Sequence, residues 1–187
     1  MGMHTEPRLR GRFGRPYTFV ERCTSTQRLL DGAPEGAVAV TDEQTEGRGR
    51  LGRTWYAPPG TSLLFSIVLE PPVAAARLAE LSLVAGTAVA EAIETETGLG
   101  TAVKHPNDVL VDGRKVAGIL AEAVEGRVVL GVGVNVSQTA AQLPDDVATP
   151  ATSLLLEGVV VDSAELLAAI LERLEAHYDR WVTSAGT

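Results

Sequence analysis

Hydrophobic and polar residues follow two periods along this 187-residue chain, and these periods predict its elements. Residues 61–69 form an almost continuous apolar run, which is typical of a strand buried on both faces. Shorter runs at 17–22 and 37–41 predict two strands before it. In residues 77–97 apolar positions recur every three or four residues, which predicts an amphipathic helix, and Gly98 stands where a C-terminal cap is expected.

The second half of the chain has the pattern of an antiparallel meander followed by a helix. Asp-Gly and Glu-Gly dipeptides, which favour tight turns, separate three strand-like runs at 109–111, 115–124 and 127–136. Residues 102–104 predict a short strand before them. A capping box at Asp162 and Glu165 predicts a last amphipathic helix that ends near Trp181. This order indicates an α+β fold, with a mixed or antiparallel sheet flanked by helices, and not a doubly wound parallel fold.

Length, charge and composition exclude several classes of protein. The formal net charge of -8 repels nucleic acid, so we expect no nucleic-acid partner. Residues 1–16 are too few for a helix-turn-helix module and are predicted to form a flexible, solvated arm before one domain at 17–183. Cys23 is the one cysteine, which suits a reducing compartment, and the cytoplasm is expected. No run reaches eighteen apolar residues, so no membrane role is expected.

Residues 46–60 predict a loop that binds an anion. They hold four glycines, three arginines and two prolines, which neither a helix nor a central strand tolerates. Glycines let backbone amides approach a ligand, and the arginine fork grips carboxylate or phosphate oxygens. A plain solvated loop fits the composition equally well.

Three further segments combine polar or glycine residues in ways that suit ligand binding. They are Ser25-Thr26-Gln27, then Lys104-His105-Pro106-Asn107-Asp108 with Lys115 beyond it, and Gly131-Val132-Gly133-Val134-Asn135. In the first segment the hydroxyls could hydrogen-bond a small polar head group. In the second, polar side chains at a sheet edge could converge on a ligand. In the third, alternating glycines leave one face of a strand without side chains. The alternatives are a helix cap, a polar turn and a bulge.

Taken together and in chain order, these segments resemble the motifs of biotin protein ligases. The family motifs are Ser-Thr-Asn, Gln-Thr-x-Gly-Arg-Gly-Arg, Lys-Trp-Pro-Asn-Asp, Lys-x-x-Gly-Ile-Leu and Gly-x-Gly-x-Asn, and the likeness runs over roughly residues 20–182. Gln27 replaces the family's asparagine, and His105 replaces its tryptophan. The resemblance implies a class II aminoacyl-tRNA synthetase-like catalytic fold. The repressor-type N-terminal DNA-binding domain and the C-terminal SH3-like barrel are expected to be absent.

The resemblance also implies an activity and its partners. The activity is ATP-dependent formation of biotinyl-5'-AMP, with Mg²⁺, followed by transfer of biotin to a lysine. That lysine belongs to the biotin carboxyl carrier protein domain of a biotin-dependent carboxylase. Metal ligands and homodimer formation stay open at this point.

The residue roles follow from motif position. The biotin site would comprise Ser25, Thr26, Gln27, Thr45, Gly47, Arg48, Arg50, Trp55, Lys115, Gly118, Leu120 and Gly131. The ATP site would comprise Arg48, Arg50, Arg53, Lys104, Asn107, Asp108, Lys115 and Asn135. Arg50 and Lys115 would act in catalysis.

Two other functions remain compatible with the sequence. A lipoate or octanoate ligase or transferase resembles the same fold, but a dithiolane or alkyl end prefers an apolar pocket over the hydroxyls of Ser25, Thr26 and Thr45. A biotin-binding module with weak transfer activity is the non-enzymatic alternative.

Overall fold

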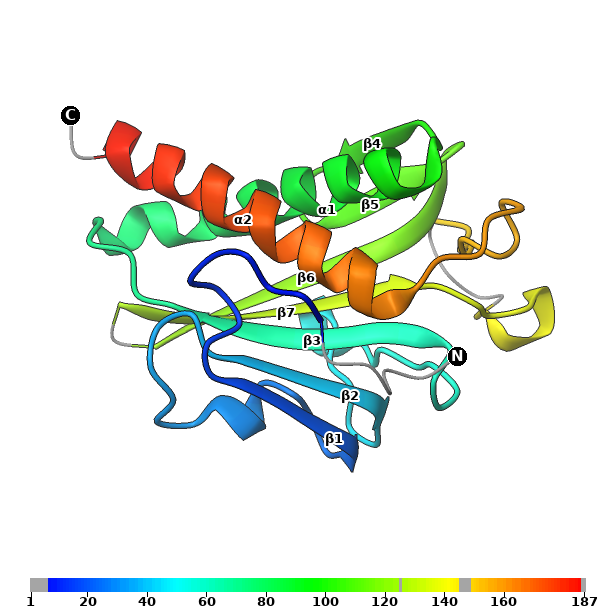
Figure 1. The fold of residues 1–187 in the computed structure, drawn as a ribbon, viewed down its shortest axis with the longest axis horizontal. Coiled ribbons are helices and arrows are strands. Elements are labelled where there is room, and N and C mark those ends of the chain that lie inside the picture. The colour runs from blue at the N-terminus through cyan, green and yellow to red at the C-terminus, as the bar shows by residue number, and fades with distance from the viewer. Residues whose placement is uncertain (1–6, 125, 145–148, 186–187) are drawn as a thin grey trace.

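The computed structural model describes residues 7–124, 126–144 and 149–185, which form one mixed sheet with two helices packed on one face (Figure 1). The strands are β1 Tyr17–Cys23, β2 Val38–Gln44, β3 Ser62–Leu69, β4 Thr101–Lys104, β5 Asp108–Val111, β6 Arg114–Val124 and β7 Arg127–Asn135. The helices are α1 Leu81–Thr97 and α2 Ser163–Ala185. Short 3₁₀ turns are η1 Arg28–Leu30, η2 Arg50–Gly52, η3 Ala75–Glu80 and η4 Ala140–Gln142.

The seven strands follow the order β1-β2-β3-β7-β6-β5-β4. β1 runs parallel to β2, and every other neighbouring pair is antiparallel. The predicted meander is therefore confirmed as β5-β6-β7, and the α+β class with a mixed sheet is confirmed as well. The parallel β1–β2 pair was not predicted, because the two runs give no local signal of their relative direction.

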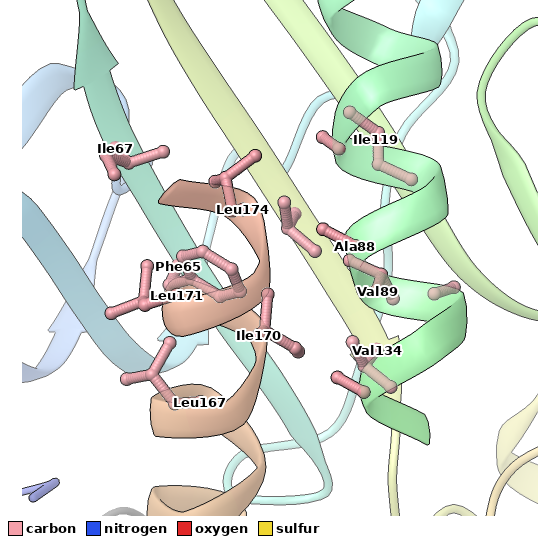
Figure 2. Packing of buried hydrophobic residues seen from close by; sticks show 14 of the residues in the cluster. Phe65, Ile67, Ala88, Val89, Ile119, Val134, Leu167, Ile170, Leu171 and Leu174 are labelled. Atoms are coloured by element: carbon pink, nitrogen blue, oxygen red, sulfur yellow. The ribbon is translucent and has the colours of Figure 1, made fainter. Parts of the chain in front are cut away.

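The core lies between the sheet and the two helices. Strand β3 is buried at all eight positions, as its apolar run predicts. Phe65 and Ile67 point from β3 toward Leu171 and Leu174 of α2, while Val89 of α1 covers the neighbouring part of the sheet (Figure 2). The opposite face of the sheet carries no α-helix among the described residues.

Both predicted amphipathic helices form, with changes at their ends. Residues 75–80 make the 3₁₀ turn η3, so α1 begins at Leu81, four residues later than predicted. Gly98 ends α1 in the left-handed region at φ 75°, as predicted. Asp162 Oδ1 accepts the backbone N–H groups of Ala164 and Glu165, which caps α2 as predicted.

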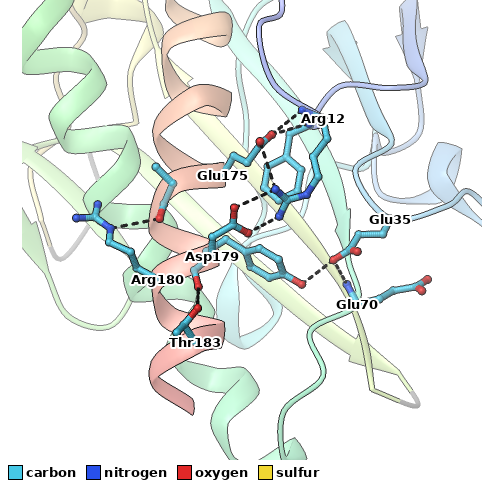
Figure 3. Close-up of polar contacts among 10 residues, drawn as sticks. Arg12, Glu35, Glu70, Glu175, Asp179, Arg180 and Thr183 are labelled. Atoms are coloured by element: carbon cyan, nitrogen blue, oxygen red, sulfur yellow. Dashed lines mark hydrogen bonds and ion pairs between the residues drawn. The ribbon is translucent and has the colours of Figure 1, made fainter. Parts of the chain in front are cut away.

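The prediction of a solvated N-terminal arm is wrong for residues 7–16, while residues 1–6 lie outside the described part of the chain. Phe13 is 1% exposed and packs against Tyr178 of α2 with ring centroids 5.6 Å apart. Arg12 pairs with Asp179 and Glu175, and the Glu175 carboxylate accepts the backbone N–H groups of residues 12 and 13 (Figure 3). The segment contains four arginines, which favour solvent, but its buried Phe13 side chain decides where it lies.

The alternative interpretation of Ser25-Thr26-Gln27 as a helix cap is also wrong. Only the three-residue turn η1 follows, and no side chain caps it. The Thr26 hydroxyl instead hydrogen-bonds to Gln44 of β2 and Ser66 of β3, so it is not available to cap the local backbone.

Within the described residues, no helix combines the length and apolar composition needed to cross a membrane.

Candidate active site

The sheet face opposite the helices holds a cavity of about 200 Å³. Its floor comes from three adjacent strands, since Gly131 of β7 pairs with Ser66 of β3 on one side and with Leu120 of β6 on the other. Gly133 sits in the same way between β3 and Gly118. The glycines leave this part of the face without side chains, as predicted from their spacing.

Most of the predicted site residues line this cavity. They are Ser25, Thr26, Gln27, Arg48, Arg50, Arg53, Trp55, Asn107, Asp108, Lys115, Gly118, Leu120, Gly131 and Asn135. Thr45, Gly47 and Lys104 are not among the lining residues. Thr45 is exposed and its hydroxyl points at the Cys23 carbonyl, 3.5 Å away, while Lys104 Nζ donates to Thr149 Oγ1 at 2.6 Å.

One end of the cavity is a buried, neutral, hydrogen-bonded recess. Thr26 donates its backbone N–H to Gln44 Oε1 at 2.8 Å, and its hydroxyl lies 3.1 Å from that oxygen and 2.7 Å from Ser66 Oγ. Gln27 Nε2 donates to the Val129 carbonyl at 3.2 Å. Ser25 and Thr26 are each 2% exposed. Buried polar groups of this kind suit a neutral polar ligand group that accepts and donates hydrogen bonds.

Two residues of this recess, Gln44 and Ser66, were missed by the sequence reasoning. Each had a signal. Gln44 is the glutamine of the Gln-Thr-x-Gly segment, immediately before the chosen Thr45, and Ser66 is a polar residue within a fully buried strand. A polar side chain in such a strand needs a partner, which here is Thr26.

The other end of the cavity gathers cations. Lys115 Nζ lies 2.7 Å from Asp108 Oδ1, and Arg50 Nη1 donates to Asn107 Oδ1 at 3.5 Å. Asn107 and Asp108 are neighbours in the chain, and their partners Arg50 and Lys115 both line the cavity. Asn107 Nδ2 donates to the Ile119 carbonyl at 2.9 Å, which turns the amide oxygen toward Arg50. An anionic ligand group is the natural occupant of this end.

The predicted loop is confirmed and has internal order. Arg48 pairs with Thr54 as an isolated antiparallel bridge, and Gly49 N–H donates to the Arg53 carbonyl at 2.7 Å. Leu51 and Gly52 at the tip have φ of 57° and 74°, a conformation that suits glycine and strains leucine. Residues 47–54, here named the arginine loop, therefore form a small hairpin at the edge of the cavity.

Trp55 lies across the glycines of the floor. A Cβ atom added at Gly133 would stand 2.6 Å from its indole, and one added at Gly118 would stand 2.8 Å from it. Lys115 Nζ lies 5.5 Å from the centroid of the Trp55 ring, within cation–π range. The indole Nε1 is buried and has no hydrogen-bond partner within the described part of the chain. The bare floor at Gly118 and Gly133 is thus filled by Trp55, while Gly131 faces Gln27 and Ser66.

Asn135 lies at the edge of the cavity and is 5% exposed. Its Nδ2 donates to the Thr152 carbonyl at 2.9 Å, and its Oδ1 accepts a bond from Gln138 Nε2 at 3.0 Å. In this structure Asn135 therefore fastens the end of β7 to the segment that follows it.

Other reactive groups stand apart from this chemistry. Burial raises the pKa of the Cys23 thiol, which leaves less of the nucleophilic thiolate. His105, which replaces the family tryptophan, is exposed. The described residues contain no group of three or more His, Cys, Asp or Glu side chains arranged to hold a metal ion.

The class of protein follows from the match of residues 19–138 to the model of the biotin/lipoate A/B protein ligase family. The chain belongs to this family.

Individual relatives agree with the family. The chain is 36% identical over 185 residues to the bifunctional ligase/repressor BirA of Bacillus spizizenii, covering 93% of this chain and 57% of the relative. It is 42% identical over 166 residues to the biotin–[acetyl-CoA-carboxylase] ligase of Mycobacterium tuberculosis, covering 82% and 59%. The chain thus spans less than two thirds of the length of these relatives.

Among solved structures, the fold is similar to the biotin protein ligase of Aquifex aeolicus in complex with biotin and ATP. The TM-score is 0.80 at 33% identity, over 89% of this chain and 72% of that one.

Proposed function

We propose that residues 17–183 form the catalytic domain of a biotin protein ligase. The domain joins biotin to AMP and then passes the biotinyl group to a lysine of a biotin carboxyl carrier protein. The observation that carries the proposal is one cavity with two unlike ends, a neutral hydrogen-bonded recess at Thr26 and a cation cluster at Lys115. Biotin has the matching ends, a neutral ureido ring and a carboxylate.

The cation cluster suits the first half-reaction. A carboxylate oxygen attacks the α-phosphorus of ATP, a bond forms between them, and pyrophosphate leaves. Two anions must approach each other, so the main task of the protein is to supply fixed positive charge. Arg50 and Lys115 would face the carboxylate and the α-phosphate, with Arg48 beside them and Arg53 nearer the nucleotide. No covalent intermediate on the protein is needed.

Magnesium would enter with ATP. The Asn107 amide oxygen and the Asp108 carboxylate line the cavity, and oxygen atoms of this kind, together with phosphate oxygens, are the ligands that Mg²⁺ prefers. The ion would neutralise charge on the leaving pyrophosphate. Asp108 would exchange its present partner, Lys115, for this role.

In the second half-reaction the acceptor lysine is the nucleophile. Its neutral amine attacks the acyl carbon of the mixed anhydride, an amide bond forms, AMP leaves with the former anhydride oxygen, and the amine loses a proton. Lys115 would stabilise the negative charge on AMP as it leaves. The acceptor would be a carrier domain of a biotin-dependent carboxylase, as the name of the Mycobacterium tuberculosis relative suggests.

The neutral recess favours biotin over lipoate or octanoate, since a ureido ring can hydrogen-bond to the polar groups of Thr26, Gln44 and Ser66, whereas an alkyl or dithiolane end prefers an apolar pocket. The test is ATP–pyrophosphate exchange with each acid in turn. We expect exchange with biotin and little with the other two acids. Exchange with lipoate or octanoate alone would refute the choice of substrate. Biotin binding without exchange would indicate a binding module.

A matched pair of variants tests the recess. Thr26→Ser keeps the hydroxyl, whereas Thr26→Val keeps the shape and removes the hydroxyl. Loss of a buried hydrogen bond costs about 1–3 kcal/mol, so Thr26→Val is expected to weaken biotin binding about tenfold. Calorimetric titration measures the affinity, and equal binding by both variants would contradict a polar recess for the ring.

A further inference from the structure

We propose that Glu122 is a positioning residue that anchors the arginine loop to the sheet through Arg48, and so sets how long the activated intermediate stays in the site. The inference rests on the proposed function for its second part, the retention of the intermediate. Its first part, the anchoring, concerns the ligand-free protein and holds or fails independently.

The arginine loop is closed on itself by backbone hydrogen bonds, and its tip is exposed. Backbone bonds join Gly49 to Arg53 and Trp55 to Gly47, so the hairpin keeps its own shape. Leu51 at the tip is 87% exposed, and Arg53 and Thr54 are exposed as well. Since the side chains at the tip are exposed, polar contacts of the arginines add to the packing of the adjacent Trp55 in holding the hairpin in place.

A short polar contact joins the loop to the sheet, the ion pair of Arg48 Nη2 with Glu122 Oε2 at 2.8 Å. Arg50 reaches Asn107 at the longer distance of 3.5 Å. Glu122 follows Leu120 by two residues on β6, so both side chains stand on the same face of the sheet, the face that carries the site. The carboxylate is therefore placed to hold the root of the loop beside the cavity.

The geometry leaves Arg48 able to serve a ligand at the same time. A guanidinium carries five N–H donors in a rigid fork, and the bond to Glu122 uses Nη2. Arg48 also lines the cavity, so donors on Nε and Nη1 remain for a phosphate or carboxylate. Glu122 fixes the direction of the fork, and the loop stays over the cavity while the intermediate is bound.

The expected effect is modest because both side chains are partly exposed, 43% for Arg48 and 38% for Glu122. Exposed ion pairs stabilise by amounts that correspond to about a two- to fivefold change in an equilibrium, and salt weakens them. Loss of the Glu122 charge should therefore open the loop about two- to fivefold more often. The difference from the parent protein should shrink as salt concentration rises.

The experiment compares Glu122→Gln and Glu122→Asp with the parent protein. Glu91→Gln is the matched control, because Glu91 also makes a 2.8 Å contact, with His177, but on the helices. Trypsin cleavage after Arg48, Arg50 and Arg53 in the ligand-free protein measures opening. Release of the intermediate is measured as biotin labelling of an unrelated protein, set against the rate of ATP–pyrophosphate exchange.

We expect Glu122→Gln to be cut about two- to fivefold faster and to label the unrelated protein more per exchange event. Glu122→Asp keeps the charge and should lie nearer the parent protein, and Glu91→Gln should match the parent. Glu122→Gln cleavage equal to that of Glu91→Gln would overturn the anchoring. Faster cleavage with unchanged labelling would overturn the role in retention. Absence of exchange in the parent protein would count against the proposed function and leave the cleavage result valid.

Discussion

A methyl group at Gly133 tests the position of the Trp55 indole. The added Cβ would lie 2.6 Å and 2.7 Å from Cε2 and Cζ2 of the ring. Carbon atoms rest about 3.5–4.0 Å apart, so the ring must retreat by about 1 Å. Gly133 cannot yield, because β7 is paired at this residue with Leu64 on one side and Gly118 on the other. Trp55 is partly exposed and can move.

Gly133→Ala is expected to change the free energy of unfolding little and the rate of the reaction strongly. Because the ring can move toward solvent, Gly133→Ala avoids most of the strain of an overpacked core, and alanine in a strand lowers the entropy of the unfolded chain. We expect the free energy of unfolding to change by less than about 1 kcal/mol. A displacement of about 1 Å in a site can reduce the rate about a hundredfold. We expect kcat/KM of biotin-dependent exchange to fall about 10- to 100-fold.

The assay is tryptophan fluorescence, measured in a protein that carries Trp181→Phe. The emission then comes from Trp55, the other of the two tryptophans. Gly100→Ala is the matched control, because a Cβ at Gly100 meets no atom within 4 Å. Gly133→Ala should shift the emission to longer wavelength and lower the exchange rate, and Gly100→Ala should do neither. Urea unfolding checks stability. Unchanged emission and exchange in Gly133→Ala would refute the placement of the indole on the floor of the cavity.

Three further predictions concern other parts of the molecule. Arg50→Gly removes one of the two converging cations, so adenylation should remain detectable while the intermediate escapes and labels unrelated proteins; labelling confined to the carrier would contradict this. Burial and the bond to the Glu35 carboxylate raise the pKa of Tyr178 above its ordinary 10.0, so stability from its neutral phenol is complete below pH 10.0 and is lost as the pH rises further. Thermal unfolding at pH 9 to 11 should therefore show a steeper loss for the parent protein than for Tyr178→Phe, and parallel curves would refute the linkage. Phe13→Ala should lower the free energy of unfolding by about 3–5 kcal/mol, measured in urea, because the ring is buried; a change typical of exposed residues would restore the picture of a solvated arm.

Elements with a local signal could be predicted from the sequence. The buried strand β3, the helix α1 with its left-handed Gly98, and the capped start of α2 follow from side-chain spacing and from caps a few residues away. The same holds for the loop at residues 46–60, whose glycines and prolines exclude a helix or a central strand. Residue order within the motifs also indicated most of the side chains that line the cavity.

Contacts between residues far apart in the chain depend on the tertiary fold. Thr26 and Ser66 are 40 residues apart, and Arg48 and Glu122 are 74 apart. Their contacts depend on strand order and on register, which no local period encodes, because a shift of one residue would turn each side chain to the other face. Three other contacts depend on the fold in the same way. They are the packing of Trp55 over Gly118 and Gly133, the parallel pairing of β1 with β2, and the packing of Phe13 against Tyr178. In each case the free energy comes from surfaces that become neighbours only after the sheet has formed.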